Sequence, residues 1–551
     1  MIDRRRFLQA LPAAAAFPSA ASAAPAKRPN ILLILADDLG YSDPGCYGGE
    51  IETPNLDRLA QGGVRFTQLY NNARCCPSRA AILTGRHPHA VGMGNMQGGK
   101  SRPGFPGYSG QVSPSVPFLP TVLRDSGYST FMAGKWHLGA PGPIDRGFDD
   151  YYGMVHGFDS FWNPAKYTRL PSGRPTIPWK EPFYATDAIT DHALAFIQSA
   201  RQNPAKPWFT YLAYNAPHFP LHAPKDLIYK YQPVYEQGWD EIRDKRFARM
   251  KQLGLVDPRW KMSPRSIVGP NRVSDVNGWA AKQNPAWDTI PADRRKDLAR
   301  RMAVFAAMVD RMDQNIGRVL TDLETAGELS NTLIIFCADN GACAEWDPWG
   351  FDISSGPQNI LHSGSKLDEM GQPGTYHSYG SAWANTCNTP LSLYKHYTHE
   401  GGISTPSIAH WPAGLKARPG AVNHQPWHFI DILPTLTSVA GAKTPPETAG
   451  VNMAPILQGK KVDRGPLFFE HEGSRAVREG KWKITALYPK GQWELYDIEA
   501  DRTEQFNLAT QHPDRVKRMA AQWESWAKRN NVIPRIWSPQ FSETAPAKAP
   551  G

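Results

Sequence analysis

Residues 29–38 read Pro-Asn-Ile-Leu-Leu-Ile-Leu-Ala-Asp-Asp. Their centre, residues 31–36, is a continuous apolar run, without the polar and apolar alternation of a strand that has one face in water. The run therefore predicts a strand buried on both faces, as in a parallel sheet covered by helices. Asp37 and Asp38 follow directly, and two like charges at the end of a buried strand are costly unless something positive lies between them.

Strand-like and helix-like patterns alternate on both sides of this first strand. The alternation predicts an α/β fold, with a large doubly wound, mixed and mostly parallel sheet flanked by helices. In such a sheet, ligands bind at the carboxyl ends of the strands. The further strands are expected at residues 64–70, 130–133, 208–214 and 332–338, and the helices at residues 55–63, 78–84, 120–126, 185–198 and 299–326.

The pattern also divides the chain. We expect a large domain over residues 27–444 and a small C-terminal α+β subdomain with an antiparallel sheet over residues 445–540. Two stretches of the large domain, near residues 224–291 and 346–385, are rich in Pro, Gly, Trp and His, and we interpret them as insertions that wall a pocket. The Ala- and Pro-rich tail at residues 541–551 is expected to be disordered.

The N-terminal segment, residues 1–23, has the features of an export signal. Residues 3–9 read Asp-Arg-Arg-Arg-Phe-Leu-Gln, which fits a twin-arginine motif, and Ala21-Ser22-Ala23 fits a cleavage site. The alternative is a disordered arm flanked by arginines. The signal predicts a bacterial protein that the twin-arginine translocase exports, already folded, to the periplasm. No apolar run approaches the roughly 20 residues that span a bilayer, so no transmembrane segment is expected.

Composition sets the broad class of protein. Hydrophobic residues make up 41% of the 551 residues, and the chain has 18 tryptophans, which indicates a packed globular core. The formal net charge is +10. Basic clusters at residues 243–246 and 294–296 lie beside aspartates in helix-like stretches, and we interpret them as solvated helix faces. No nucleic-acid-binding motif accompanies them, so no nucleic-acid partner is expected.

Residues 75–85 read Cys-Cys-Pro-Ser-Arg-Ala-Ala-Ile-Leu-Thr-Gly and resemble the signature of the sulfatase family. The alternative for a lone Cys-x-Pro is a buried cysteine at a helix start. The resemblance implies that a formylglycine-generating enzyme reads Cys75, Pro77 and Arg79 in the unfolded chain and oxidises Cys75 to Cα-formylglycine. Hydration of that aldehyde gives two hydroxyls on one carbon. One attacks the sulfur of a sulfate ester, and the other then expels sulfate by reforming the carbonyl group.

Two pairs of polar residues end buried strands in this chain, Asp37-Asp38 and Asp339-Asn340. Either pair alone is more simply a cap between strand and turn. Together with the cysteine signature, they resemble the sulfatase metal set of Asp37, Asp38, Asp339 and Asn340, completed by an oxygen of modified Cys75. Because all these ligands are oxygens, we expect Ca²⁺, with Mg²⁺ as the second choice, whereas Zn²⁺ would recruit His or Cys.

Further matches in the family's order imply a sulfate-binding set. The sequence Gly-Lys-Trp-His-Leu-Gly resembles the family's second signature, in which Lys135 binds sulfate oxygens and His137 is the base that releases sulfate. His218 matches the residue that contacts the sulfate and the leaving oxygen, and Lys395 matches a second sulfate-binding lysine. Arg79 would hold the formylglycine side and the metal carboxylates in place.

The resemblance, strongest to bacterial arylsulfatases, implies a hydrolase that cleaves sulfate monoesters into an alcohol and inorganic sulfate. One alternative is a phosphonate or phosphate ester hydrolase with the same aldehyde, although such relatives carry a His where this chain has Asn340. Another is a non-catalytic binder of sulfated glycans with unmodified Cys75. Ser404 departs from the family, in which an Arg often follows the Glu-Gly-Gly motif, and leaves substrate contacts open. The natural alcohol (aryl, alkyl or sugar) and the oligomeric state also stay open.

Overall fold

The computed structural model describes residues 28–97, 105–269, 272–488 and 491–533. The export signal predicted for residues 1–23 and the tail predicted for residues 541–551 lie outside the described residues.

Within these residues, ten strands form one large sheet, with β1 (Asn30–Ala36) in its interior. Both neighbours of β1, namely β6 (Trp208–Ala213) and β7 (Thr332–Ala338), run parallel to it, and β3 (Ser129–Gly134) and β4 (Asp150–Gly153) continue the parallel part beyond β6. The mixed, mostly parallel sheet that the sequence predicts is confirmed. The other strands are β2 (Val64–Tyr70), β5 (Thr168–Leu170), β8 (Ser404–His410), β9 (Ala421–Asn423) and β10 (Trp427–His428), of which β8 runs antiparallel to β2 and β7, and β5 to β4.

The continuous apolar run of β1 is explained by two cores, one on each face of the sheet. Leu32, Ile34 and Ala36 belong to one core, while the alternate residues of the strand belong to the other. Because successive side chains of a strand point to opposite faces, a strand covered on both sides needs an apolar residue at every position.

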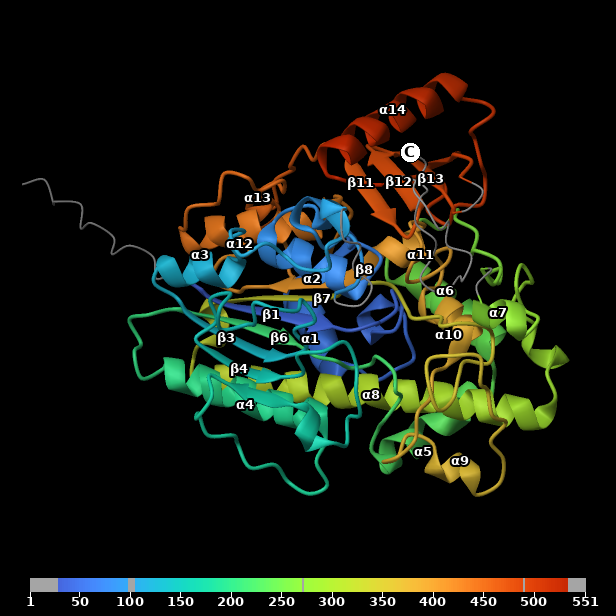
Figure 1. The fold of residues 1–551 in the computed structure, drawn as a ribbon, viewed down its shortest axis with the longest axis horizontal. Helices are drawn as coiled ribbons and strands as arrows, with labels where there is room; N and C mark the ends of the chain where they lie inside the picture. Colours follow the sequence, from blue (N-terminus) through green and yellow to red (C-terminus); the bar gives the residue numbers. More distant parts are fainter. Residues whose placement is uncertain (1–27, 98–104, 270–271, 489–490, 534–551) are drawn as a thin grey trace, which may run out of the picture.

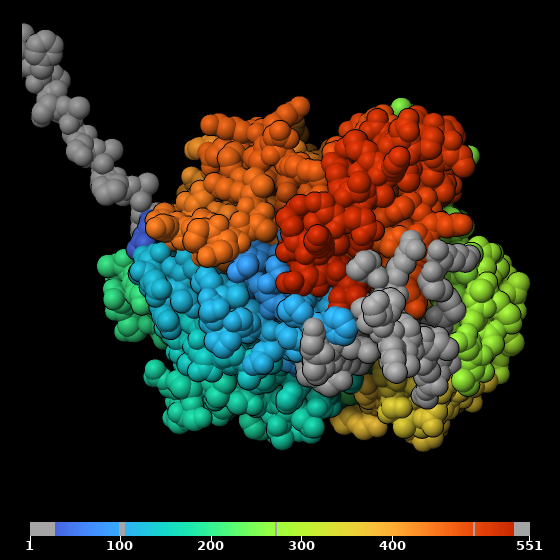
Figure 2. All heavy atoms as spheres, turned by 45° about the horizontal axis from the view of Figure 1, so that its top comes forward, coloured from blue at the N-terminus to red at the C-terminus, as the bar shows by residue number. Residues whose placement is uncertain are grey.

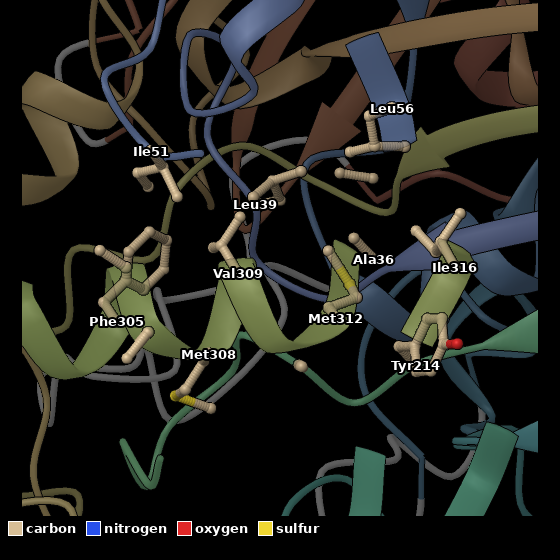
Figure 3. Close-up of a cluster of buried hydrophobic side chains, with 14 of the residues drawn as sticks. Ala36, Leu39, Ile51, Leu56, Tyr214, Phe305, Met308, Val309, Met312 and Ile316 are labelled. Carbon is tan, nitrogen blue, oxygen red and sulfur yellow. The ribbon is translucent and has the colours of Figure 1, made fainter. Parts of the chain in front are cut away.

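Helices cover both faces of the sheet (Figure 1). On one face, α8 (Ala292–Thr325) turns Phe305, Val309 and Met312 into the core, where Leu39 and Ile51 also lie (Figure 3). None of the described helices combines the length and the apolar character that a bilayer span requires. One face carries α1 (Pro54–Gly62), α4 (Ala185–Ala200), α5 (Lys225–Tyr235) and α8 (Ala292–Thr325), and the other α2 (Cys75–Thr84), α3 (Leu119–Asp125), α12 (Ile432–Ala440) and α13 (Ala454–Leu457).

Helix α8 begins at Ala292, earlier than the apolar pattern predicts. Its first turns bury charge instead of apolar surface. Arg301 donates to Asp297 and also to Asp352, at 2.8 Å, and all three side chains are buried. Buried ion pairs of this kind are invisible to an analysis of hydrophobic periodicity, so the start of the helix is missed.

Two interpretations of residues 224–291 need correction. The stretch is not irregular throughout, because it contains α5, α6 (Trp239–Gln252) and α7 (Arg272–Val276). The basic cluster in α6 is not a wholly solvated face, since Arg243 and Arg246 are buried. The Arg246 guanidinium donates to Asp43 and Glu50, each at 2.7 Å. The acidic partners lie far away in sequence, so the sequence of the helix alone does not reveal that these arginines are buried.

The C-terminal part of the chain forms a separate four-stranded antiparallel sheet, as predicted (Figure 1). In the space-filling view, the red C-terminal residues occupy the upper right of the molecule (Figure 2). Helix α14 (Pro513–Arg529) packs Met519 and Trp523 against Val477 and Ile484 of this sheet. Helix α13 also follows residue 444, but it packs with the core of the large sheet. The strands are β11 (Leu467–His471), β12 (Ser474–Glu479), β13 (Trp482–Ala486) and β14 (Glu494–Asp497).

A buried ionic cluster joins the C-terminal sheet to the large one. Glu400, in α11 (Glu400–Ile403), accepts from Lys483 Nζ at 2.9 Å and from Arg502 Nε at 2.7 Å. Arg502 Nη2 also donates to Ser404 Oγ, at 2.9 Å. A guanidinium therefore does lie beside Ser404, but it is supplied by the C-terminal part of the chain and not by residue 404.

We expect Arg502→Leu to lower the free energy of unfolding by about 3–5 kcal/mol, because it leaves the Glu400 carboxylate buried with fewer partners. Urea unfolding measures the loss. Arg518→Leu is the matched control, since its pair with Glu479 is partly exposed and should contribute less than about 1 kcal/mol.

Burial alone would raise the pKa of Glu400, but Lys483 and Arg502 hold it below its usual 4.5. The stability from this cluster should therefore be complete above about pH 4.5 and lost as the pH falls further. Equal losses of the free energy of unfolding in Arg502→Leu and Arg518→Leu would contradict the predicted role of Arg502.

Candidate active site

The predicted site residues meet at one edge of the large sheet. Asp37 and Asp38 follow β1, and Asp339 follows β7, its parallel neighbour. Lys135 and His218 follow β3 and β6, which are also parallel to β1. Carboxyl ends of parallel strands lie at the same edge, so residues far apart in sequence come together there. The structure completes the set with Asn340 and His137 from the same strand ends, Cys75 and Arg79 from α2, and Lys395 from the loop before α11.

Four of these residues form a group that has the geometry for a metal ion. One ligating atom each of Asp37, Asp38, Cys75 and His218 lies within 4.8 Å of the others, and all four side chains are buried. Asp37 Oδ1 and Asn340 Oδ1 are buried without a hydrogen-bond partner among the described residues. Unpaired buried oxygens are costly. A cation between them would satisfy both oxygens, so the donor set fits a divalent metal.

Asp339 is placed differently from the other predicted ligands. It is not in the group of four, and its Oδ2 accepts from Arg79 Nε at 3.0 Å and Nη2 at 2.8 Å. Arg79 Nη1 also donates to the carbonyl oxygen of Lys135, at 2.7 Å. Arg79 thus fixes the Asp339 carboxylate and the end of β3 relative to each other.

Two buried lysines neutralise the first pair of aspartates. Lys135 Nζ donates to Asp37 Oδ2 at 2.5 Å, and Lys395 Nζ lies 2.8 and 2.9 Å from the two carboxylate oxygens of Asp38. With Arg79 beside Asp339, three cationic side chains face three carboxylates. When all three carboxylates are ionised, these six side chains together carry no net charge, which limits the cost of burying them.

Burial changes the protonation of two of these groups. It raises the pKa of Asp37 to about 8, an effect that Asp339 reinforces and that Lys135 and Arg79 oppose. Burial also raises the pKa of the Cys75 thiol, to about 12. The thiol therefore keeps its proton at neutral pH, and since the thiolate is the reactive form, unmodified Cys75 is a poor nucleophile and a poor metal ligand.

His218 is arranged to leave one ring nitrogen aimed at the site. Its Nδ1 donates to the carbonyl oxygen of Phe219 at 2.6 Å, and Nε2 lies 3.3 Å from Asp38 Oδ2. Burial lowers the pKa of His218 to about 3, with Asp38 opposing the change, so the imidazole is neutral at pH 7. The Nε2 lone pair and the carboxylate oxygen then face each other, an arrangement that needs a proton or a cation between them. The all-oxygen metal set and the contact of His218 with the leaving oxygen both stay predictions.

His137 is held by the loop that follows β4. Its backbone N–H donates to the Val155 carbonyl oxygen at 3.2 Å, and a Cβ on Gly157 would lie 2.6 Å from its Nε2. Burial and the nearby Lys135 lower the pKa of His137 well below its ordinary value. Its Nδ1 has no hydrogen-bond partner in the described part of the chain. His137 is therefore a neutral imidazole that can accept a proton.

Several residues around the site have left-handed backbone conformations, which L-residues other than Gly, Asn and Asp seldom adopt. Asp38 has φ +66°, His137 φ +56° and His396 φ +82°. Such conformations cluster at functional sites, where the surrounding structure holds them.

A second layer of charge behind Cys75 is absent from the predicted set. Arg74, which precedes Cys75, pairs with Glu345 at 3.3 Å, and Glu345 lies 4.0 Å from Lys395 Nζ. His396 bridges Glu345, at 3.4 Å, and Glu472 from the turn between β11 and β12, at 2.9 Å. The C-terminal sheet therefore reaches the site through Glu472. Two signals in the sequence point to this layer: Arg74 precedes the cysteine signature, and His396, which could line the pocket, follows Lys395.

Comparisons with known proteins agree with this geometry. The family model described as Sulfatase matches residues 29–442, and the one described as N-sulphoglucosamine sulphohydrolase, C-terminal, matches residues 392–528. An uncharacterized sulfatase of Schizosaccharomyces pombe is 33% identical, over 93% of this chain and 95% of that protein. An arylsulfatase of Klebsiella aerogenes is 34% identical, over 76% and 88%. The solved structure of Ps i-CgsB with k-i-k-neocarrahexaose has a TM-score of 0.65 and 25% identity, over 94% of this chain and 96% of that one.

Proposed function

Because this chain belongs to the sulfatase family, we propose that it is an arylsulfatase-type sulfuric ester hydrolase that uses Cα-formylglycine made from Cys75 and a bound divalent cation. The observation that carries the proposal is the position of Cys75. It begins α2 within ligating distance of Asp37, Asp38 and His218, in a buried site that also holds the ammonium groups of two lysines. The thiol itself is a poor nucleophile here, so the position is useful to catalysis only after chemical conversion.

The surrounding side chains supply binding and proton transfer. Lys135 and Lys395 place Nζ atoms where sulfate oxygens can accept hydrogen bonds, and such charge-assisted bonds are strong in a buried site. Neutral His137 is suited to take the proton from the Cys75-derived hydroxyl when sulfate leaves. His218, with Lys395, is suited to hold the leaving oxygen and to stabilise or protonate it.

The cation is proposed to be Ca²⁺, with Mg²⁺ as the second choice. Oxygens of Asp37, Asp38, Asp339 and Asn340 would hold it, together with the Cys75-derived oxygen. When bound, the cation would polarise the sulfate and lower the pKa of the attacking hydroxyl. Arg79 would keep Asp339 oriented, and Lys135 and Lys395 would exchange part of their contact with the aspartates for contact with sulfate.

Maturation and location are part of the same proposal. Every residue of α2 is buried, including Cys75, Pro77 and Arg79, so an enzyme that reads these residues as a linear tag must meet the unfolded chain. A formylglycine-generating enzyme is therefore the proposed partner during synthesis. The twin-arginine translocase, which accepts folded proteins, would then deliver the finished enzyme to the periplasm.

The reaction can be tested on protein co-produced with a formylglycine-generating enzyme and supplied with Ca²⁺. We expect kcat/KM for 4-nitrophenyl sulfate to exceed that for a matched phenylphosphonate monoester by about tenfold or more, with Cys75→Ala as the blank. The reason is Asn340, a neutral amide where phosphonate-cleaving relatives carry a His. Faster cleavage of the phosphonate would favour the phosphonate hydrolase instead. Absence of Cys75-dependent turnover of either ester would favour a sulfated-glycan binder.

A further inference from the structure

An aromatic ring stands exposed next to the proposed reaction centre. The Phe158 ring lies parallel to the His218 ring, with centroids 5.6 Å apart and an angle of 14° between the planes. It is 43% exposed, which is unusual for a phenylalanine. The preceding residue, Gly157, packs on His137. One loop after β4 therefore borders both histidines and presents an apolar ring beside the one that faces the leaving oxygen.

Phe158 is the outer member of a larger aromatic wall. Its ring centroid lies 5.0 Å from that of Phe219, which in turn lies 5.0 Å from Phe351. Cys343 belongs to the same cluster, and its Sγ is 3.7 Å from Lys395 Nζ. The wall thus begins at a sulfate-binding lysine and runs outward past His218. Trp346 and Tyr376, both half-buried, pack against it.

Two residues after Phe351, Ile353 has a strained backbone. Its φ is +68°, a conformation in which a β-branched residue is a genuine outlier. Its backbone N–H donates to the Tyr376 carbonyl oxygen at 3.2 Å, and its side chain is 63% exposed. Strain that persists in a folded chain points to a local role. Here it leaves an apolar side chain exposed in the segment that carries Phe351.

We propose that Phe158, supported by Phe219 and extended by Ile353, binds the leaving group and selects esters whose leaving group is a planar aromatic ring. This inference rests on the proposed function, because it places the leaving oxygen at His218. A phenol held there by its oxygen has its ring beside Phe158, where offset stacking stabilises it. A pyranose would bring hydroxyl groups that neither Phe158 nor Ile353 can hydrogen-bond, and a linear alkyl chain offers no ring face.

The test compares Phe158→Ala with Phe158→Tyr on three substrates: 4-nitrophenyl sulfate, a linear alkyl sulfate and galactose 6-sulfate. We expect Phe158→Ala to lower kcat/KM for the aryl ester about tenfold, mainly through KM, because stacking is present before and during the reaction. The tyrosine variant keeps the ring and should stay within about twofold of the unaltered protein. The alkyl and sugar esters should change less than about twofold with either variant.

Two further variants complete the comparison. Phe506→Ala removes a phenylalanine that is 53% exposed but lies in the C-terminal part of the chain after β14, and it should leave all rates unchanged. Ile353→Asn introduces a residue that tolerates positive φ, so the loop keeps its conformation, and we expect an aryl-specific loss of about threefold.

Three results would overturn the inference. One is an equal loss on all three esters, which would make Phe158 a positioning residue for His218. Another is an unchanged aryl rate in Phe158→Ala. A third is a loss confined to galactose 6-sulfate, which would show that the wall stacks on a sugar. Failure of the proposed function has a different signature, because the unaltered protein would then cleave none of the three esters in a Cys75-dependent way.

Discussion

Replacing Cys75 with alanine should lower kcat for 4-nitrophenyl sulfate by about 10⁴-fold or more, since the residue that becomes the nucleophile is gone. The side chain is buried in a well-packed helix, and alanine is a good helix former, so the fold should survive. Release of 4-nitrophenol, measured at equal concentrations of folded protein, gives the ratio of kcat between the unaltered protein and the variant. Cys76→Ala is the matched control, because Cys76 is equally buried one position away and its Sγ bonds to backbone atoms, among them the His137 carbonyl oxygen, to which it donates.

The serine variant at the same position separates the aldehyde chemistry from simple nucleophilic attack. A serine hydroxyl can accept the sulfate group, but it has no second hydroxyl with which to expel sulfate. We therefore expect one equivalent of 4-nitrophenol per active site, followed by no further release, with the protein heavier by the mass of SO₃. Sustained turnover by this variant would mean that water attacks at sulfur and that the aldehyde is not needed.

Removing the divalent cation with EDTA should lower kcat/KM by about 100-fold or more, a loss of at least about 2.7 kcal/mol of transition-state stabilisation. Ca²⁺ should restore the activity, with Mg²⁺ less effective. The cation should also raise Tm, because a ligand at 100 times its Kd stabilises the folded state by about 2.7 kcal/mol. Asp38→Asn should remove most of this rise in Tm, whereas Asp463→Asn, outside the site, should keep it. Full activity after exhaustive chelation would contradict a catalytic metal.

The effect of the cation should grow with pH. In the cation-free protein, burial and Asp339 raise the pKa of Asp37 from 3.8 to about 8, so folding favours the protonated acid. The stability that this group gives the cation-free protein is complete below about pH 4 and is lost as the pH rises toward 8. Cation binding requires the carboxylate and releases the proton. The rise in Tm caused by Ca²⁺ should therefore increase up to about pH 8 and level off above it. A rise that does not depend on pH would show that Asp37 is ionised before the cation binds.

The parts of the fold that burial patterns determine could be predicted from sequence. The strands β1 and β7 are apolar at every position after the first because helices cover both faces of the sheet, and both were located closely. The first turns of α8 and the buried face of α6 were not predicted, because their interior positions hold arginines. Arg246 is buried only because Asp43 and Glu50 come from a distant part of the chain, and no local pattern reveals such a pairing.

The candidate site also combines residues that sequence patterns reveal with residues that they do not. Residues at strand ends or within motifs, such as Asp37 and Lys135, were found because their place in the sequence fixes their place in space. Glu345, Glu472 and Phe158 come from loops and from a different sheet, and only the tertiary arrangement brings them to the site. Which ring nitrogen of His218 faces Asp38 could not be predicted, for a related reason. Its direction follows from the hydrogen bond of Nδ1 to the Phe219 carbonyl oxygen, a local detail that residue identity does not determine.

Because α2 is completely buried, the rate at which Cys75 is modified competes with the rate at which the chain folds. Under the proposed function, the modifying enzyme must act on each chain before its core forms. A chain that folds first keeps a thiol that no later treatment of the native protein can reach. The specific activity of a preparation then records how modification competed with folding during synthesis. Faster production should lower that activity without changing Tm. Unfolding and refolding in the presence of the modifying enzyme should recover the lost fraction, whereas incubation of the native protein with the same enzyme should recover none.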